Sequence, residues 1–443
     1  MLVEKRDILY KSLFFIFIIS LAGGSYMLNF SLFGIDVYLF RIVLSLNIML
    51  LFLNKDLVFY TSSFTKTIFY FLLFWIIYGI ISFTWCEDIT IAIHEVIYLV
   101  IGLLTYIYFV SINSYFNGSL NKYLLNNWLY GVIPTFIIAF FEINLGSHLE
   151  GNFLINLSKI PYMSDYDFVP FTTFDNPNNL AIYLALSLVF FIIMVRKYNQ
   201  VFFFSILFCI NSYLMIKTSS RIGVFFLEVL VFILIALNYQ RLKSFFTKAN
   251  IFKVTFATLL FSLLFIFYNF KSAHDNQSMK REKLKEEYHL KIKNKYVTNS
   301  YDSSSYNIRK NLILSGLDFA SSSYFLGVGA GSFEVKVRKE ENKYPTYGIS
   351  NPHNYFIEVF SQYGILITLF IIILFLFMLI KVLPFILNYK YNDEPLFILL
   401  LILCFGLTSN SNSSFLPLPL NWFMFSLIII LFDKFYSKDG IKH

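Results

Sequence analysis

The chain has 443 residues, of which 57% are hydrophobic and only 14% are charged. Soluble globular proteins carry about a quarter charged residues, so this chain has too few charges to cover a soluble protein of its size. The composition argues against a cytosolic multi-domain enzyme and a disordered protein, and it favours a lipid bilayer. The formal net charge of +8 is only a weak sign of nucleic-acid binding, because basic residues commonly mark the cytoplasmic side of membrane proteins. The three cysteines, Cys86, Cys209 and Cys404, are far apart and suggest neither a disulfide framework nor a zinc site.

About twelve stretches of roughly 20 mostly apolar residues are long enough to cross a bilayer as helices. In chain order they run approximately over 11–29, 33–53, 67–85, 91–112, 125–144, 178–195, 200–217, 220–239, 251–270, 362–388, 394–410 and 417–433. The first stretch is followed by further spans and lacks a small-residue cleavage site, so it is not expected to be a removable signal peptide. The sequence thus predicts an all-α polytopic membrane protein with about twelve transmembrane helices.

Lysine and arginine in the connections between these spans predict which way the helices face. The connections that hold basic residues all fall on one side of the membrane, with Lys5, Arg6, Lys11, Lys55, Lys66, Lys122, Arg196, Lys197, Arg241, Lys243, Lys248, Lys390, Lys434, Lys438 and Lys442. The alternate short connections are poor in basic residues. We therefore expect both termini in the cytoplasm and an even number of spans.

Two polar segments, 145–177 and 271–361, fall on the outer side in this topology. Loops longer than about 15 residues are usually functional or disordered. The first part of the longer segment, Lys271–Lys295, is dense in charge of both signs and is typical of a solvated helix or mobile arm. The chain is thus expected to have three parts: nine spans in 1–270, a large extracytoplasmic loop in 271–361, and three spans with a cytoplasmic tail in 362–443.

Charged residues inside the predicted spans are the first candidates for function. Arg41 lies within the second span, where a charge is costly unless it faces a cavity or a partner. Near a span end its long side chain would instead reach the interface, and both readings stay open. Glu142 and Glu228 are similar cases, and we expect them in ion pairs or helix contacts rather than in catalysis.

Two helix starts on the outer side carry polar motifs. In Thr-Ser-Ser-Arg221-Ile-Gly, Ser219 or Ser220 is suited to cap the eighth span, and its N–H groups together with Arg221 suit an anion. A lipid headgroup is the simpler partner for such an arginine. In Phe-Asp-Asn-Pro-Asn178-Asn, the Asp, Asn and Pro are typical of a helix start, and Asn side chains are also suited to hydrogen-bond sugar hydroxyls.

The outer loop ends in its most informative stretch. This stretch holds Arg309, then Gly327-Val-Gly329-Ala-Gly331-Ser-Phe, then Pro-His353-Asn354-Tyr-Phe. The glycines allow positive φ and close backbone approach, and a tight turn alone would explain them. Their spacing is neither a dinucleotide fingerprint nor a Walker loop. His353 precedes the tenth span and is suited to accept a proton from a sugar hydroxyl near neutral pH, although a packed histidine is the simpler reading.

Taken together, in this order and between about twelve spans, these motifs resemble those of the O-antigen ligase and polymerase superfamily of bacterial membrane glycosyltransferases. The resemblance covers most of the chain and is most specific over about 170–370. Teichuronic-acid and capsule polymerases of Gram-positive bacteria look similar. Many members follow the His-Asn segment with a Gly-Leu-Leu-Gly-like turn, whereas this chain has Gly364-Ile-Leu-Ile367, a departure that concerns packing more than chemistry.

The resemblance implies a metal-independent, inverting glycosyltransferase with a GT-C-like fold and no cofactor, which builds surface polysaccharide in the bacterial cytoplasmic membrane. Its donor would be a glycan on undecaprenyl diphosphate at the outer leaflet, and its acceptor would be another saccharide. By the match of motifs, Arg221 and Arg309 would bind the diphosphate, and His353 would activate the acceptor hydroxyl as a base. Candidates for lining the cavity are Arg41, Asn178, Asn354, Gly327, Gly329 and Gly331.

The chemistry fits the residues, since a lipid diphosphate departs without a general acid when its charge is neutralised. A polymerase and a ligase share the donor and differ in the acceptor, and the sequence leaves both open. A transporter or flippase of lipid-linked oligosaccharides is the alternative. A transporter should, however, carry polar residues through the midplane and show repeat-related halves, whereas the candidate residues here cluster at the outer face. No nucleic-acid partner is expected.

Overall fold

The computed structural model describes residues 2–32, 35–149, 168–198, 200–245, 305–346, 348–388, 393–410 and 414–439. The chain divides into two compact units. The first comprises Met1–Ile155, Asp167–Phe226 and Ser303–His443, and the second comprises Asn156–Tyr166 and Leu227–Asp302. Within the described residues, the second unit contributes only the C-terminal part of α9 (Arg221–Phe245), and the other elements belong to the first unit.

The described residues are predominantly helical, as the apolar stretches predict. The remaining helices are α1 (Leu2–Ala22), α2 (Leu39–Leu53), α3 (Ser63–Ile81), α4 (Ile89–Tyr115), α5 (Leu120–Leu145), α7 (Pro177–Tyr198), α8 (Val201–Lys217), α12 (Ser305–Ser322), α13 (Ser332–Arg338), α14 (Tyr355–Asn388), α15 (Asp393–Thr408) and α16 (Pro419–Asp439). A 3-10 turn, Ser82–Thr84, follows α3. Six helical stretches, in α3, α4, α5, α7, α14 and α16, are long and apolar enough to cross a membrane among the described residues, and α2 and α8 are shorter apolar helices. The protein is therefore a helical multi-pass membrane protein.

Every predicted span that falls on described residues coincides with a helix, whereas 251–270 lies outside them. Six helical stretches of the described residues are long and apolar enough to cross a membrane. The expected number of about twelve transmembrane helices therefore stays a prediction. The same holds for the large extracytoplasmic loop, because its first part lies outside the described residues as well.

A short β-hairpin lies between α1 and α2. Its first strand falls in the predicted connection between the stretches 11–29 and 33–53, and its second strand falls within 33–53, which was predicted to be helical. Strand β1 (Phe30–Leu32) pairs antiparallel with β2 (Ile35–Val37), and Phe30 lies opposite Val37. Both strands alternate apolar and polar side chains, Phe-Ser-Leu and Ile-Asp-Val, which is the period of a strand. A window of about 20 residues averages over so short an alternation, so the predicted boundaries of these two spans were wrong by several residues.

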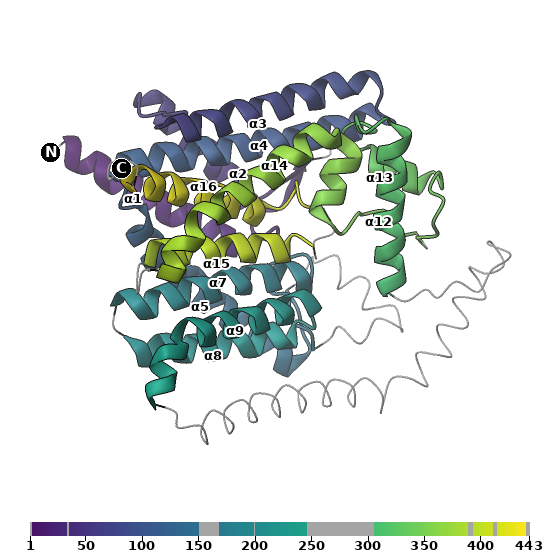
Figure 1. Ribbon diagram of the computed structural model, residues 1–443. Coiled ribbons are helices and arrows are strands. Elements are labelled where there is room, and N and C mark those ends of the chain that lie inside the picture. Colours follow the sequence, from purple (N-terminus) through teal and green to yellow (C-terminus); the bar gives the residue numbers. More distant parts are fainter. Residues whose placement is uncertain are drawn as a thin grey trace, which may run out of the picture. The chain divides into compact units, whose positions relative to one another are not determined.

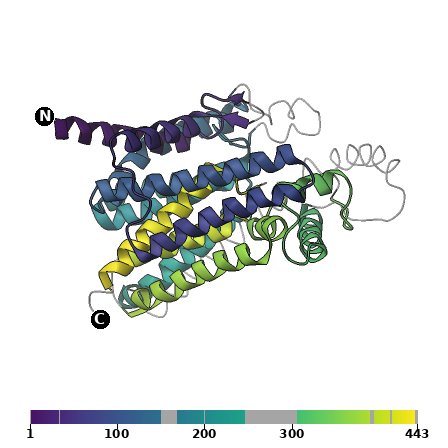
Figure 2. The same ribbon diagram turned by 90° about the horizontal axis from the view of Figure 1, so that it is seen from above.

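The two ends of the helices in the first unit differ in their charged contacts. At one end, termed the α12–α13 end, α12 runs across the ends of the longer helices (Figure 1). At the opposite end, ion pairs join connections that carry basic residues: Arg6 with Asp56, Arg196 with Asp393 and Lys434 with Glu394. Figure 2 shows the start of α1 and the end of α16 there. Arg6, Arg196 and Lys434 thus lie at one end of the described helices, and the side of the membrane on which that end lies stays a prediction.

A break in α14 joins the membrane helices to the segment before α13. Gly364 has φ 79° and ψ −174°, so α14 consists of a short helix before this residue and a long helix after it. Three main-chain hydrogen bonds, termed the backbone junction, are formed there: Val328 N to Ser361 O at 2.8 Å, Gly329 N to Gln362 O at 3.0 Å and Ile365 N to Phe325 O at 2.9 Å. A Cβ on Gly364 would lie 2.5 Å from the carbonyl oxygens of Phe325 and Leu326, so only glycine fits.

Charge pairs fasten α13 to the connection between α3 and α4. Glu87 pairs with Lys336 at 2.7 Å and with Lys339 at 2.7 Å, and its backbone N–H donates to the Ser332 hydroxyl at 3.1 Å. Hydrogen bonds from Lys336 and Lys339 lower the pKa of Glu87, because they favour the carboxylate. These contacts therefore fix α13 in place.

We expect Gly364→Ala to destabilise the protein by about 1–3 kcal/mol or more, because its backbone conformation is nearly exclusive to glycine and the added Cβ would collide with two carbonyl oxygens. Gly406→Ala in α15 is the matched control. Its added Cβ meets no atom within 4 Å, and alanine is the better helix former. Thermal unfolding of the purified variants in detergent measures both effects. An unchanged melting temperature for Gly364→Ala would contradict the strained junction.

Glu87→Gln should lower stability at neutral pH by up to about 1 kcal/mol. Because the folded-state pKa of Glu87 is lowered, its pairs stabilise the fold above the unfolded value of about 4.3 and lose this contribution as pH falls through the folded pKa. The difference in melting temperature between wild type and variant should therefore shrink from pH 7 to pH 4. In a Lys336→Gln/Lys339→Gln background, Glu87→Gln should make no pH-dependent difference, and a persisting one would show that other groups are responsible.

Candidate functional site

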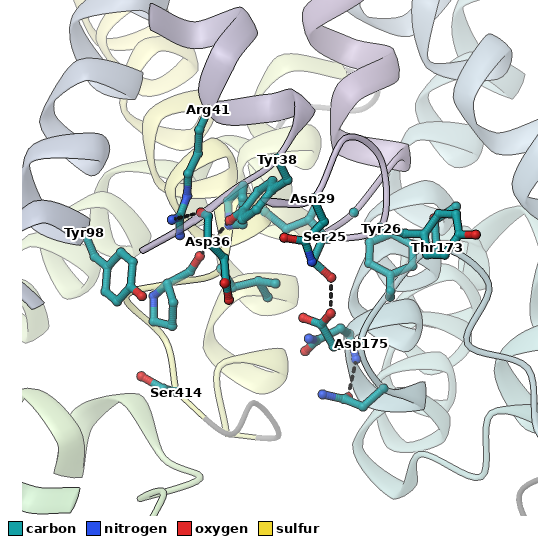
Figure 3. Close-up of a pocket in the computed structure, with 18 of the residues that line it drawn as sticks. Ser25, Tyr26, Asn29, Asp36, Tyr38, Arg41, Tyr98, Thr173, Asp175 and Ser414 are labelled. Carbon is teal, nitrogen blue, oxygen red and sulfur yellow. Dashed lines mark hydrogen bonds between the residues drawn. The ribbon is translucent and has the colours of Figure 1, made fainter. Parts of the chain in front are cut away.

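The first unit holds a cavity of about 920 Å³ at the α12–α13 end (Figure 3). Its walls come from the end of α1, the start of α2, α4, the start of α7, α13 and the loop before α16. The polar and tyrosine side chains of the lining are Ser20, Ser25, Tyr26, Asn29, Asp36, Tyr38, Arg41, Tyr98, Thr173, Asp175, Asn176, Asn179, Glu334, Arg338, Asn351 and Ser414. Ligand pockets measure roughly 300–1,000 Å³ and are mostly apolar. This cavity is therefore large enough for a sizeable ligand and is notably polar for so apolar a chain.

Arg41 is the buried charge of the cavity, with 9% of its surface exposed. Its guanidinium carbon lies 4.5 Å from the ring centre of Tyr38 and 5.0 Å from that of Tyr98, so two aromatic rings contact the cation. Nη1 donates a hydrogen bond to the backbone carbonyl of Asp36 (Figure 3). The hairpin thus holds the arginine that the sequence singled out as a charge inside a span, and this side chain faces a cavity.

Glu142 in α5 holds the wall before α7. Its Oε2 accepts hydrogen bonds from the backbone N–H groups of Phe171 at 2.9 Å and Thr172 at 2.8 Å, and His148 Nδ1 lies 3.1 Å from its Oε1. Glu142 is 1% exposed, so these partners satisfy a carboxyl that burial would otherwise penalise. The expected ion-pair role of this residue is therefore observed.

The same wall continues through Asp175 and Asn176 into α7. The Asn176 side chain accepts a hydrogen bond from Asn179 N at 3.0 Å and so caps the helix, as its Asp-Asn-Pro start predicts. Asp175 accepts a hydrogen bond from the Ser25 hydroxyl (Figure 3). Burial raises the pKa of Asp175, and the nearby Asp36 acts in the same direction. This carboxyl is therefore less readily ionised than a fully solvated aspartate.

Glu358, in the short first part of α14, holds the loop before α16. Its side chain is 1% exposed and accepts hydrogen bonds from the Ser414 hydroxyl and from Phe415 N, the latter at 2.8 Å. The rings of Tyr355 and Phe415 lie 3.7 Å apart between centroids. Two side chains of α14 therefore determine the position of a cavity wall that is distant in sequence.

Helix α13 contributes an acid and a base to the lining. Arg338 Nη2 lies 2.7 Å from Glu334 Oε2. Burial raises the pKa of Glu334, and the charge of Arg338 lowers it. One of the two arginines of the cavity is thus balanced by a carboxylate on its own helix.

Arg221 and Arg309 lie close enough to influence each other. Arg221 is the exposed first residue of α9, and the Ser220 hydroxyl accepts a hydrogen bond from Gly223 N at 3.4 Å, which is the predicted helix cap. Arg309 is half-buried in the first turns of α12. Burial and then the positive charge of Arg221 lower the pKa of Arg309. These two predicted site residues, far apart in sequence, therefore lie within electrostatic range of each other.

His353 and Asn354 immediately precede α14 in the chain. His353 has φ 50°, an uncommon conformation for a residue with a side chain. Asn354 accepts a hydrogen bond from Ile357 N at 3.1 Å and donates one to the Asn410 side chain at 2.8 Å. This hydrogen bond joins the start of α14 to Asn410, which follows α15. Asn351 of the cavity lining is two residues from His353.

The glycine-rich segment belongs to the packing of this region. Gly327, Gly329 and Gly331 have φ values of 93°, 98° and 68°. Added Cβ atoms would lie 2.4 Å from Gln362 O at Gly327 and 3.1 Å from the Cα of Cys86 at Gly329. The glycines therefore permit close approach to α14 and to the connection before α4, beyond the tight turn that their sequence suggested.

The candidate residues are thus divided between the cavity and its surroundings. Arg41 lies in the cavity lining, while Arg221, Arg309, His353, Asn354 and the three glycines lie outside the lining residues. Asn178 also lies outside it, although its neighbours Asn176 and Asn179 take part. Sequence reasoning did not identify five further residues, because none belongs to a motif: Tyr38, Tyr98, Asp36, Glu334 and Glu358. Two of them had a signal in the sequence, since Glu334 and Glu358 are acidic residues in the first turns of α13 and α14. Within the described residues, no group of three or more His, Cys, Asp or Glu side chains is placed to hold a metal ion.

Comparisons with known proteins agree with the motifs. A family model described as O-antigen ligase matches residues 204–372, the part that contains Arg221, Arg309, the glycine-rich segment and His353. The Teichuronic acid biosynthesis protein TuaE of Bacillus subtilis (strain 168) is 24% identical over 379 residues, which cover 82% of this chain and 71% of that protein. These two findings confirm the resemblance predicted from the sequence. The chain is a multi-pass membrane protein similar to those of the O-antigen ligase and polymerase superfamily. Members of this superfamily are glycosyltransferase-type enzymes of surface polysaccharide biosynthesis.

Proposed function

We propose that the protein transfers or polymerises a glycan from an undecaprenyl-diphosphate-linked donor onto an acceptor saccharide, as an inverting enzyme that uses neither a metal nor a cofactor. The reaction takes place at the outer face of the bacterial cytoplasmic membrane. Both termini then lie in the cytoplasm, and the α12–α13 end faces outwards with the loop 271–361. The observation that carries the proposal is the electrostatic interaction between the like charges of Arg221 and Arg309.

Two like charges near each other are unfavourable unless an anion lies with them. Neither arginine forms an ion pair with a carboxylate in the part of the chain that the structure describes, and Arg221 lowers the pKa of Arg309. A diphosphate would supply the missing negative charge, and guanidinium groups match phosphate oxygens in a bidentate manner. The N–H groups at the start of α9 add the positive end of a helix dipole. This arrangement supports a diphosphate site.

The proposed reaction is a single displacement at the anomeric carbon of the donor sugar. His353 accepts the proton of the acceptor hydroxyl, the hydroxyl oxygen forms the new glycosidic bond, and the bond from the anomeric carbon to the diphosphate oxygen breaks. The lipid diphosphate leaves with the electron pair, and Arg221 and Arg309 stabilise its charge. His353 is suited to this role by its pKa range, and its uncommon φ of 50° is of the kind that clusters at functional sites.

The cavity supplies the place for a saccharide. Its amide and hydroxyl side chains match sugar hydroxyls, and Asn351 connects its lining to His353 along the chain. The named role of TuaE in teichuronic acid biosynthesis supports a polymer as the product. Polymerase and ligase share this chemistry, so their acceptors distinguish them.

His353→Ala should lower turnover by at least about a hundredfold, because general base catalysis contributes roughly 10²–10⁴-fold, while donor affinity stays within about threefold. The assay uses purified protein in detergent, a lipid-diphosphate-linked saccharide and EDTA, and it measures extended glycan and released lipid diphosphate. Release of lipid diphosphate with product distinguishes an enzyme from a transporter of lipid-linked oligosaccharides. His94→Ala in α4 is the matched control and should remain active. Full activity of His353→Ala would remove this residue from the mechanism.

Arg221→Gln and Arg309→Gln should each weaken donor binding by roughly ten- to a hundredfold, since hydrogen bonds to charged groups contribute about 1.5–3 kcal/mol. Equilibrium binding of farnesyl diphosphate, a short analogue of the donor lipid, reports on the lipid diphosphate without the glycan. Arg196→Gln, at the opposite end of α7, is the control because its partner is Asp393. Wild-type affinity in both Arg221→Gln and Arg309→Gln would exclude the proposed diphosphate site.

A further inference from the structure

The two arginines that line the cavity have different environments. Arg338 is paired with Glu334 at 2.7 Å. Arg41 forms no ion pair with a carboxylate of the described residues. Its Nη1 donates a hydrogen bond to the uncharged backbone carbonyl of Asp36, and its buried Nε atom has no hydrogen-bond partner among the described residues. The cavity therefore contains one balanced and one unbalanced guanidinium.

A guanidinium that is only 9% exposed requires compensation, because removing a charge from water costs several kcal/mol. The rings of Tyr38 and Tyr98, at 4.5 Å and 5.0 Å, stabilise the cation but do not neutralise it. A guanidinium offers five N–H donors in a planar fork, which matches the two oxygens of a carboxylate. The free Nε edge of Arg41 therefore lacks the partner that an anionic ligand would provide.

The remaining acidic side chains of the cavity do not replace that partner. Glu334 pairs with Arg338, and Asp175 is an exposed residue that accepts a hydrogen bond from the Ser25 hydroxyl. Asp36 is an exposed residue, so water screens its carboxylate. Figure 3 shows Arg41 with Tyr38, Tyr98 and Asp36 around it and Asp175 farther along the lining. The unbalanced charge is thus local to Arg41.

We propose that Arg41, flanked by Tyr38 and Tyr98, binds the carboxylate of an acidic sugar in the saccharide that occupies the cavity. This inference rests on the proposed function, since it takes the cavity to hold a reacting saccharide. The asparagine and serine side chains of the lining contact the sugar hydroxyls, and Arg41 selects the acidic unit. Selection by charge then resides in a residue separate from Arg221, Arg309 and His353.

The test measures binding to the full chain in lipid nanodiscs by equilibrium dialysis, with three probes. These are a disaccharide that contains glucuronic acid, the same disaccharide with its carboxyl group reduced to an alcohol, and inorganic diphosphate. Wild type should bind the acidic disaccharide at least about tenfold more tightly than the neutral one. Arg41→Met should bind both equally and with the affinity of wild type for the neutral probe. Arg41→Lys, which keeps the charge but loses the fork, should retain part of the preference.

Arg196→Met, at the other end of α7 from the cavity, is the control and should keep the full preference. Melting temperatures of the variants in the same nanodiscs verify folding, and Arg41→Lys serves if Arg41→Met does not fold. Equal binding of both disaccharides by wild type, or an undiminished preference in Arg41→Met and Arg41→Lys, would overturn the inference. Displacement of the acidic disaccharide by diphosphate at equal or lower concentration would overturn it too, since the anion would then be the lipid diphosphate.

Binding and transfer are measured separately, so the two proposals fail separately. His353→Ala should keep the preference for the acidic disaccharide while it loses turnover. If the wild-type protein prefers the acidic disaccharide but has no transferase activity, the proposed Arg41 site is supported and the proposed reaction is contradicted. If the wild-type protein transfers glycan but binds the two disaccharides equally, the proposed reaction is supported and the proposed Arg41 site is contradicted.

Discussion

Three main-chain hydrogen bonds between the Phe325–Gly329 segment and the break in α14 hold the α12–α13 end together. They place α12, with Arg309, against the membrane helices, and they fix the start of α14 near His353. The short first part of α14 in turn carries Glu358, which holds the loop before α16. Since all these parts depend on one break at Gly364, the cavity and the proposed diphosphate site share a common support.

The distribution of charge follows the same division into two ends. At the end where the helices carry basic connections, Arg6, Arg196 and Lys434 are paired with the carboxylates of Asp56, Asp393 and Glu394. At the α12–α13 end, Arg221, Arg309 and Arg41 lack such partners within the described residues, while Arg338 has Glu334. Pairing is the usual state of a charge removed from water. These arginines therefore distinguish the end at which we place the chemistry from the opposite end of the helices.

Sequence alone predicted the apolar helices of the described residues, the starts of α7 and α9, and the structural importance of glycine before α13. These predictions succeeded because they depend on local chemistry: an apolar run, an Asp-Asn-Pro or Ser-Arg start, or a residue without a Cβ. The hairpin before α2 was missed because its strands are three residues long. The lining by Tyr98, Glu334 and Ser414 could not be predicted, because these residues meet only through tertiary packing, and no spacing along the chain encodes that meeting.

The walls of the cavity differ in rigidity. The wall before α7 is fastened by buried hydrogen bonds to Glu142, and the loop before α16 is fastened by Glu358. The wall at Asp36 belongs to a two-stranded hairpin, a structure that is at best marginally stable by itself. Its amide hydrogens should therefore exchange with solvent sooner than those of α1 or α7. A saccharide too long for the resting cavity would be admitted most easily by displacement of this hairpin, which would also release the carbonyl group that holds Arg41.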